Sequence, residues 1–319
     1  MNALAAALPP LTLGRTLTSW RADPGTLLAA VLLLGGYLTA RARHAGPAWP
    51  RSRTVCFVLG AASIAFVGCS FLGVYADTLF WPRAAQNVVL LMVTPLLLAM
   101  GSPVRLVADL LPPGSRARWS RVLHSAPARA LTFPLVVTVV LVVPMLVLYL
   151  SPLYPLTLRS TVASGLSGTM LVVAGWLYFW TRLRVDPTPR ADPYLVTLWI
   201  TVVEVVGDAV LGLVLWLGPL VGADHYLALH RDWGPDLRLD QVLGAGVLWV
   251  GGDVVGLPFI GIVVARMTRE DEQRAVEIDA ELDAREAAAA AQQDDPEDTA
   301  PSRLWWEDDP QLAERFRRR

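Results

Sequence analysis

The stretch RAAQNVVLLMVTPLLLAMGSPV, residues 83–104, decides the fold class of this chain. It is apolar almost throughout, but Arg83, Gln86 and Asn87 stand near its start and Pro95 interrupts it. A helix needs about 20 mostly apolar residues to cross the hydrocarbon core of a bilayer. The stretch therefore predicts a transmembrane helix, and it raises the question of what the polar residues at its start hold.

The whole chain has the composition of a membrane protein. Its 319 residues are 54% hydrophobic and only 17% charged, whereas soluble domains are about 25% charged. Apolar stretches of spanning length lie at about 25–42, 54–76, 84–104, 129–150, 160–182, 194–217 and 241–266. Backbone groups in hydrocarbon must be bonded within their own segment, and the alternating pattern of a barrel is absent. We therefore predict an all-α polytopic membrane protein with seven transmembrane helices.

The arginines are distributed unequally between the loops that alternate along the chain. Most lie in loops 41–53, 105–128 and 183–193 and at the start of the tail, from Arg266. Because basic residues collect on the cytoplasmic side of a membrane, we predict an N-terminus outside and a C-terminus inside the cell. The formal net charge of −1 argues against nucleic acid as a partner, and the apolar spans make membrane lipid an expected partner.

Composition also divides the chain into three regions. We predict an N-terminal interfacial segment over residues 1–24, the seven-helix membrane domain over 25–266 and a cytoplasmic tail over 267–319. The tail begins with a charged, alanine-rich stretch typical of a solvated helix and continues with a partly disordered segment. Its adjacent Trp305 and Trp306 are costly to expose to water, so they either anchor at the membrane interface or dock on a partner.

Three acidic residues lie inside predicted spans. Glu204 and Asp208 are four residues apart in the sixth span and so share a helix face. Asp253 lies about midway along the seventh. Charges at this depth are expensive and are usually buried, paired or functional. The three acids are consistent with a proton- or ion-coupled transporter, and equally with a structural polar cluster.

Motifs for catalysis or metal binding are weak. The stretch GLSG at 165–168 resembles the serine site of intramembrane rhomboid proteases, but that chemistry needs a nearby base. The four histidines lie in predicted loops, at His44, His124, His225 and His230. Soft Cu(I) ligands also occur within the spans, as Cys69, Met92, Met100, Met145 and Met170, but none of them forms a closely spaced pair. We therefore predict no enzyme, and we interpret the sulfur residues as packing.

Several stretches taken in order resemble one family, the CtaG-like cytochrome c oxidase assembly factors of bacteria. The central one is YADTLFWPRAAQNVVLLMVTPLLLAMGSPVRL, residues 75–106. The others are WRADP (20–24), WPRSRTVCFVLG (49–60), SPLYPLTLRS (151–160), GWLYFWTRLRVDPTPR (175–190), GDAVLGLVL (207–215), DQVLGAGVLWVGGDV (240–254) and the actinobacterial-like tail LWWEDDPQLAERFRR (304–318). The resemblance implies a bacterial plasma-membrane protein whose partners are oxidase subunits or a copper carrier, and it implies copper as the cargo.

This chain departs from the family at the residues that the resemblance assigns to metal. Arg83, Gln86 and Asn87 match a His-x-x-Gln-His-like arrangement, and Asp208 matches a histidine of the sixth span. Guanidinium has no lone pair for a metal and an amide is a poor ligand. We therefore predict an assembly scaffold in which an Arg83–Asp208 pair, joined by Glu204, replaces the metal site. The alternative is that the Arg83 side chain extends to the lipid headgroups.

Overall fold

The chain is helical in the computed structural model, which describes residues 8–183, 186, 206–207 and 209–293. It forms two compact units, Met1–Val263 and Val264–Arg319. Among the described residues, four helical segments are long and apolar enough to cross a membrane, and a bent pair brings the number to five. They are Pro24–Arg43, Arg51–Tyr75, Phe80–Met100, Thr161–Leu183 and the pair Pro134–Leu150 with Leu153–Arg159. An all-helical fold with several membrane-length helices is thus confirmed. The predicted sixth span lies mostly outside the described residues, so the count of seven stays a prediction.

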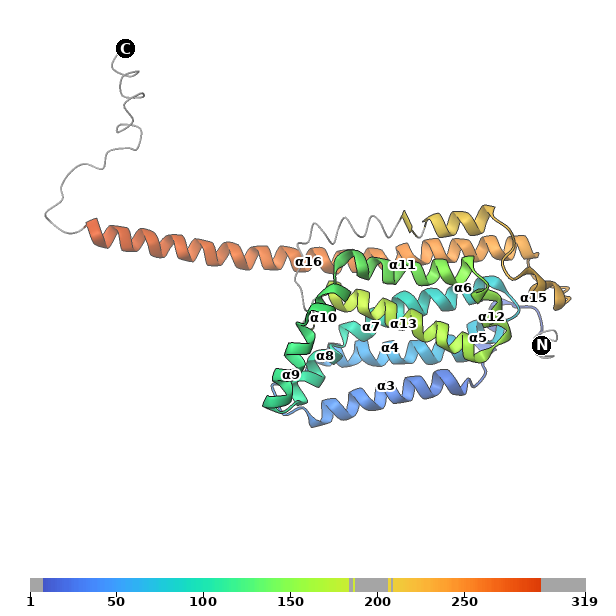
Figure 1. The fold of residues 1–319 in the computed structure, drawn as a ribbon, viewed down its shortest axis with the longest axis horizontal. Helices are drawn as coiled ribbons and strands as arrows, with labels where there is room; N and C mark the ends of the chain where they lie inside the picture. The colour runs from blue at the N-terminus through green and yellow to red at the C-terminus, as the bar shows by residue number, and fades with distance from the viewer. Residues whose placement is uncertain (1–7, 184–185, 187–205, 208, 294–319) are drawn as a thin grey trace, which may run out of the picture. The chain divides into compact units, whose positions relative to one another are not determined.

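The long helices of the first unit run side by side in alternating directions (Figure 1). They are α3 (Pro24–Arg43), α4 (Arg51–Cys69), α6 (Phe80–Val88) with its continuation, α11 (Pro134–Leu150) and α13 (Thr161–Leu183). One end of this bundle, here called the arginine end, holds Arg43, Arg51 and Arg182 at helix termini. The opposite end, here called the tyrosine end, holds the short helices α2 (Leu13–Thr18), α5 (Phe71–Tyr75), α12 (Leu153–Arg159) and α15 (Ala223–Ala228).

The third span continues as a helix past Pro95, but its backbone hydrogen-bond pattern changes just before this proline. After α6 the chain makes a π-helical turn, η1 (Val89–Val93), and continues as α7 (Thr94–Met100). The Thr94 N–H donates to the Val89 carbonyl, five residues back. Since Pro95 has no N–H, the Leu91 carbonyl lacks the donor that a regular helix would supply. The proline that interrupts the apolar run therefore widens the helix.

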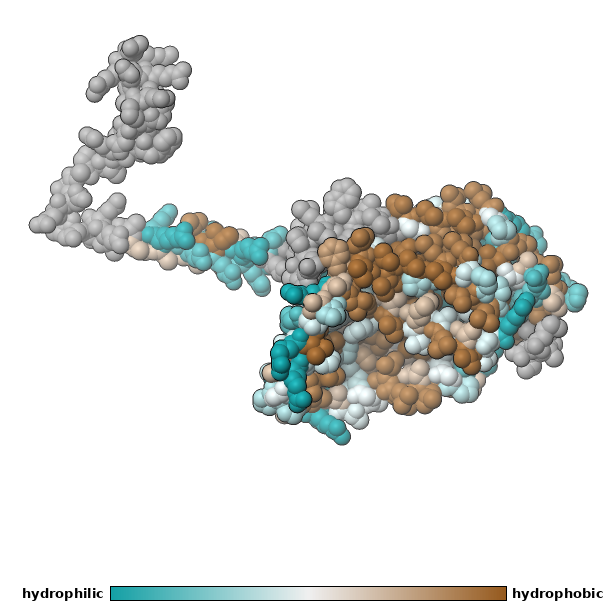
Figure 2. All heavy atoms as spheres, in the orientation of Figure 1, coloured by the Kyte–Doolittle hydropathy of each residue, from teal (hydrophilic) through white to brown (hydrophobic). Residues whose placement is uncertain are grey.

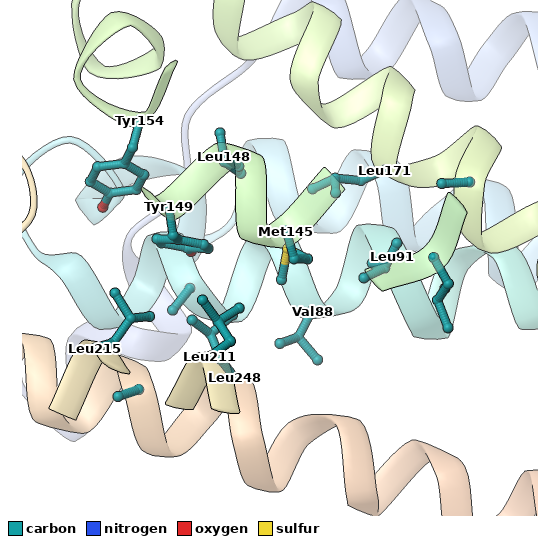
Figure 3. Close-up of a cluster of buried hydrophobic side chains, with 14 of the residues drawn as sticks. Val88, Leu91, Met145, Leu148, Tyr149, Tyr154, Leu171, Leu211, Leu215 and Leu248 are labelled. Atoms are coloured by element: carbon teal, nitrogen blue, oxygen red, sulfur yellow. The ribbon is translucent and has the colours of Figure 1, made fainter. Parts of the chain in front are cut away.

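The core lies where α6, η1, α11 and α13 meet, and residues 209–217 pack against it. Val88 and Leu91 face Met145 and Leu148, and Leu171 of α13 closes the cluster (Figure 3). Glycine makes the closest approach possible: a Cβ on Gly175 would lie 1.9 Å from the Leu91 carbonyl oxygen. The backbone of α13 thus lies directly against the widened turn.

The segment predicted as a loop at the arginine end is helical. It contains α8 (Pro103–Leu110), α9 (Pro113–Leu123) and α10 (Ala126–Leu131). Each of the three has a proline in its first turn, where the missing N–H costs nothing and the fixed φ favours a helix start. Prolines usually indicate a loop, but in this segment they lie at the starts of helices. For the same reason the predicted fourth span, 129–150, is wrong at its start, since α11 begins at Pro134.

The last helix of the chain, α16 (Leu237–Gln293), is 57 residues long. It joins the predicted seventh span and the predicted charged helix of the tail without a break. Residues 271–288 are all exposed, as expected for a helix whose surface is charged on every side.

The prediction that the four histidines lie in loops is wrong for His225, which lies in α15.

Two buried aspartates cap helices that are far away in the sequence. Asp240 accepts hydrogen bonds from the N–H groups of Phe80 (2.9 Å) and Trp81 (3.1 Å) at the start of α6. Asp186 accepts from those of Val104 and Arg105, both at 3.1 Å, at the start of α8. A carboxylate satisfies the free N–H groups of a first turn and interacts well with the helix dipole. Each aspartate therefore ties two distant segments together, one at each end of the bundle.

We expect Asp186 to make the stability of the protein depend on pH. Burial raises the pKa of its carboxyl to about 6, against the hydrogen bonds from Arg105 and Val104, which lower it. Between pH 4 and 6, roughly, the folded protein then binds a proton that the unfolded chain has released. The contribution of Asp186 to stability is thus fully present near pH 4 and is lost as the pH rises through 6.

The measurement is the thermal unfolding midpoint in detergent at pH 5 and pH 7, for the parent and for Asp186→Asn. Between pH 7 and pH 5 the parent should gain about 1.4 kcal/mol of stability relative to Asp186→Asn, since about one pH unit of this window lies below the folded pKa. Asp236→Asn is the control, because Asp236 is exposed and its carboxylate accepts a hydrogen bond from the nearby Leu239 N–H. Identical pH profiles of parent and Asp186→Asn would refute the assignment.

Candidate functional site

Arg83 lies buried in the second turn of α6, at the tyrosine end of the bundle, with 8% of its surface exposed. One terminal nitrogen donates to the Thr157 carbonyl of α12 at 3.2 Å and to Ser164 Oγ of α13 at 2.9 Å. The other lies 3.8 Å from Asp77 Oδ1. The guanidinium, which can donate five hydrogen bonds, thereby connects α6 to two other helices and to the turn that precedes α6.

Gln86 and Asn87 extend this arrangement to two more helices. Gln86 Nε2 donates to the Val67 carbonyl of α4 at 2.6 Å. Asn87 Nδ2 donates to the Tyr149 hydroxyl of α11 at 2.9 Å. Both side chains are buried, so each bond is shielded from competing water. The polar residues that open the third span therefore fasten it to α4, α11, α12 and α13.

A tyrosine layer, which the sequence does not predict, lies beside these three residues. Tyr149 stacks on Tyr154 with ring centroids 5.0 Å apart, and Phe80 packs against both rings. Figure 3 shows Tyr149 and Tyr154 together at one end of the core. The Tyr154 hydroxyl lies 2.7 Å from that of Tyr226 in α15. In the sequence each tyrosine resembles an ordinary interfacial aromatic, and only the packing of α11, α12 and α15 brings them together.

We call Asp77, Arg83, Gln86, Asn87 and the tyrosines Tyr149, Tyr154 and Tyr226 the polar cluster. His225 joins it through a 2.9 Å contact between Nε2 and the Asp77 carbonyl. The cavity beside it, lined by Phe80, Tyr226, Asp240, Gln241 and apolar neighbours, has a volume of about 10 Å³. That is the space of a single water molecule. The cluster is suited to holding helices in place, and its shape is not that of a substrate pocket.

Other predicted site residues lie outside the described part of the chain. These are Glu204 and Asp208 of the sixth span, and Trp305 and Trp306 of the tail. The Arg83–Asp208 pair therefore stays a prediction; within the described residues, Arg83 is bonded as given above. Asp253 lies in α16 and is partly buried, and its role also stays a prediction.

The polar cluster does not fit a copper ion. The Arg83 guanidinium has no lone pair for a metal, and the carboxamides of Gln86 and Asn87, whose NH2 groups donate to Val67 and Tyr149, are poor copper ligands. Within residues 8–183, 186, 206–207 and 209–293, no group of three or more His, Cys, Asp or Glu side chains could hold a metal. Cys69 Sγ accepts a hydrogen bond from Asp23 N–H at 3.5 Å, and Met145 is buried in the core. No copper step is therefore assigned to these residues.

A family model described as cytochrome c oxidase caa3 assembly factor (Caa3_CtaG) matches residues 31–270. The chain belongs to this family. The match covers the bundle from within α3 onward, including the polar cluster, and confirms the resemblance seen in the sequence. By its description, this is a family of cytochrome c oxidase assembly factors.

Three mycobacterial relatives are similar to this Caa3_CtaG chain. The uncharacterized proteins Mb0105 of Mycobacterium bovis and MT0111 of Mycobacterium tuberculosis are each 30% identical over 82% of the chain and 40% of their own length. The uncharacterized protein ML1998 of Mycobacterium leprae is 26% identical over 86% of the chain and 43% of its length. The chain thus spans about two fifths of the curated relatives it matches. No solved structure matches it.

Proposed function

We propose that this chain is a membrane scaffold for the assembly of cytochrome c oxidase, holding oxidase subunits or a carrier while the enzyme is built. The observation that carries the proposal is the polar cluster at the position where the family resemblance assigns metal ligands. In this chain Arg83, Gln86 and Asn87 bond to other helices of the bundle. A site that connects helices supports positioning of partners, and the proposed role requires neither catalysis nor copper.

In the proposed topology seven helices cross the bacterial plasma membrane. The N-terminus and the tyrosine end face the outside, and the arginine end and the C-terminus face the cytoplasm. The uneven distribution of arginines supports this orientation. The polar cluster would then stiffen the outer end of the scaffold, while the apolar faces of the helices remain in contact with lipid or with partner helices.

The transporter alternative receives less support. It depends on Glu204, Asp208 and Asp253 as titrating groups, and the family match points to oxidase assembly. Among the residues that the structure describes, the cavity beside the cluster has a volume of about 10 Å³, which is room for a single water. We therefore do not carry the transporter forward as a second proposal.

The test is a deletion strain of the source organism, assayed for oxidase haem absorbance and for oxygen consumption with and without added copper. We expect both signals to fall in the deletion strain and to stay low with copper, because a scaffold cannot be replaced by its metal. The parent gene should restore them. Normal oxidase in the deletion strain would overturn the assembly role.

A double variant separates the scaffold from a copper carrier. Cys56 and Cys69 are the two cysteines of the chain, and both are free. Cys56→Ala/Cys69→Ala should restore the oxidase as well as the parent does, at equal protein level. If that variant fails, or if copper alone rescues the deletion strain, the chain handles copper and the scaffold proposal is wrong.

A further inference from the structure

Helix α9 lies at the arginine end of the bundle and is hardly packed against it. Nearly all of its residues are exposed, and it has no buried residue. Trp119 and Val122, three apart and so on one face, are 37% and 65% exposed. Arg118 and Arg121 lie along one edge of that face. Helices with an exposed apolar face bordered by arginines lie in the plane of the membrane interface.

The charge of this region is strongly positive. Residues 103–133 contain five arginines and one aspartate, and Figure 2 shows hydrophilic residues gathered along α9. The Arg116 side chain is hydrogen-bonded within the protein: it donates to the Ala108 and Asp109 carbonyls at the end of α8. The side chains of Arg118, Arg121 and Arg129 form no hydrogen bond or ion pair with the residues that the structure describes. Three exposed cations thus stand at this end of the bundle without an internal partner.

A groove in α10 and α11, the helices that follow α9, adds an apolar surface beside Arg129. It lies at the junction of α10 and α11, is lined by Ala126, Arg129, Ala130, Phe133 and Val136, and has a volume of about 470 Å³. Phe133 is 44% exposed. The walls are apolar apart from Arg129. A phospholipid with a negative headgroup has both features that this groove offers, a phosphate for the guanidinium and acyl chains for the walls.

We propose that α9 and the groove at α10 form a binding site for anionic phospholipid headgroups, with Trp119 inserted in the membrane interface. Arg118 and Arg121 contact headgroup phosphates on one side, and Arg129 holds one above the groove. The proposal rests on the charge complementarity and on the exposed apolar face. It does not depend on which partners the chain has in oxidase assembly.

The test uses the full chain reconstituted into phosphatidylcholine bilayers that contain a small fraction of phosphatidylglycerol. One of the two lipids carries bromine on its acyl chains, because bromine quenches tryptophan fluorescence at short range. The difference between the parent and Trp119→Phe isolates the signal of Trp119 from the other tryptophans. We expect brominated phosphatidylglycerol to quench this signal more strongly than brominated phosphatidylcholine at equal fraction.

The expected preference follows from the charges. An arginine near an anionic surface changes a binding constant about fivefold, so Arg118→Gln/Arg121→Gln/Arg129→Gln should lower the preference by about tenfold or more. The matched control is Arg269→Gln/Arg274→Gln/Arg285→Gln, which removes the same charge from exposed positions of α16 and should keep the preference. An unquenched Trp119, equal quenching by both lipids in the parent, or an equal loss in the control would overturn the proposal.

Discussion

Gly175→Ala is expected to destabilise the protein by about 3 kcal/mol, a large effect for one methyl group. The added Cβ would lie 1.9 Å from the Leu91 carbonyl oxygen and 2.7 Å from Pro95 Cγ. Leu91 lies in the π turn of the third span and Pro95 follows it in α7, and a backbone carbonyl cannot rotate away as a flexible side chain can. Helix α13 would have to move away from the third span. That movement would open the core in which Leu91 and Leu171 pack.

The control lies on the same helix. A Cβ added to Gly165 of α13 would meet nothing within 4 Å. Gly165→Ala should therefore be neutral or stabilising by up to about 1 kcal/mol, because alanine is the better helix former. The measurement is equilibrium unfolding in mixed detergent micelles. Equal stability of the two variants would show that α13 does not approach the π turn.

Pro95→Ala tests whether the π turn is the reason that Gly175→Ala destabilises the protein. In Pro95→Ala the residue at position 95 regains an N–H, and the Leu91 carbonyl regains its partner within the helix. The turn should then narrow and withdraw the carbonyl from α13. The cost of Gly175→Ala should therefore be smaller in the Pro95→Ala background, and the difference is the coupling between the two sites.

The sequence predicts those features of the fold that depend on neighbouring residues. It does not predict hydrogen bonds between residues that lie far apart in the chain. Composition and length place the third and fifth spans, because burial in lipid demands a long apolar run. Arg83, Gln86 and Asn87 are visible as a polar interruption of such a run. Their bonding partners come from other helices, and no local pattern indicates them: Val67, Tyr149, Thr157 and Ser164.

The helix caps show the same limit. An N-cap is normally sought in the residue just before a helix, but α6 and α8 take theirs from Asp240 and Asp186, about 160 and 80 residues away. Helices α8 to α10 escape prediction because a proline is also a strong loop signal. The π turn at Pro95 has no sequence signature beyond the proline itself, which allows a kink, a break or a widened turn.

Arg83→Gln is expected to cost about 2–4 kcal/mol of stability and to abolish restoration of the oxidase in the deletion strain. Two contributions could account for the loss in stability, and their magnitudes decide between them. The ion pair with Asp77 is long, at 3.8 Å, and the Asp77 side chain is 29% exposed; such pairs contribute at most about 1 kcal/mol. The hydrogen bond to the Thr157 carbonyl is buried and the one to Ser164 Oγ is partly buried, and leaving a buried acceptor without a donor costs about 1–3 kcal/mol.

Asp77→Asn is therefore the matched control, and it should lose less than about 1 kcal/mol. If it destabilises as much as Arg83→Gln does, the ion pair and not the hydrogen bonds holds the cluster.

The same unfolding experiment tests the predicted partner in the sixth span. An Arg83–Asp208 pair would make Arg83→Gln/Asp208→Asn more stable than the sum of the single variants requires, because the second change removes the charge that the first leaves unpaired. Additive losses would instead mean that Arg83 acts through α12 and α13 alone, and that the polar start of the third span serves to hold those helices together.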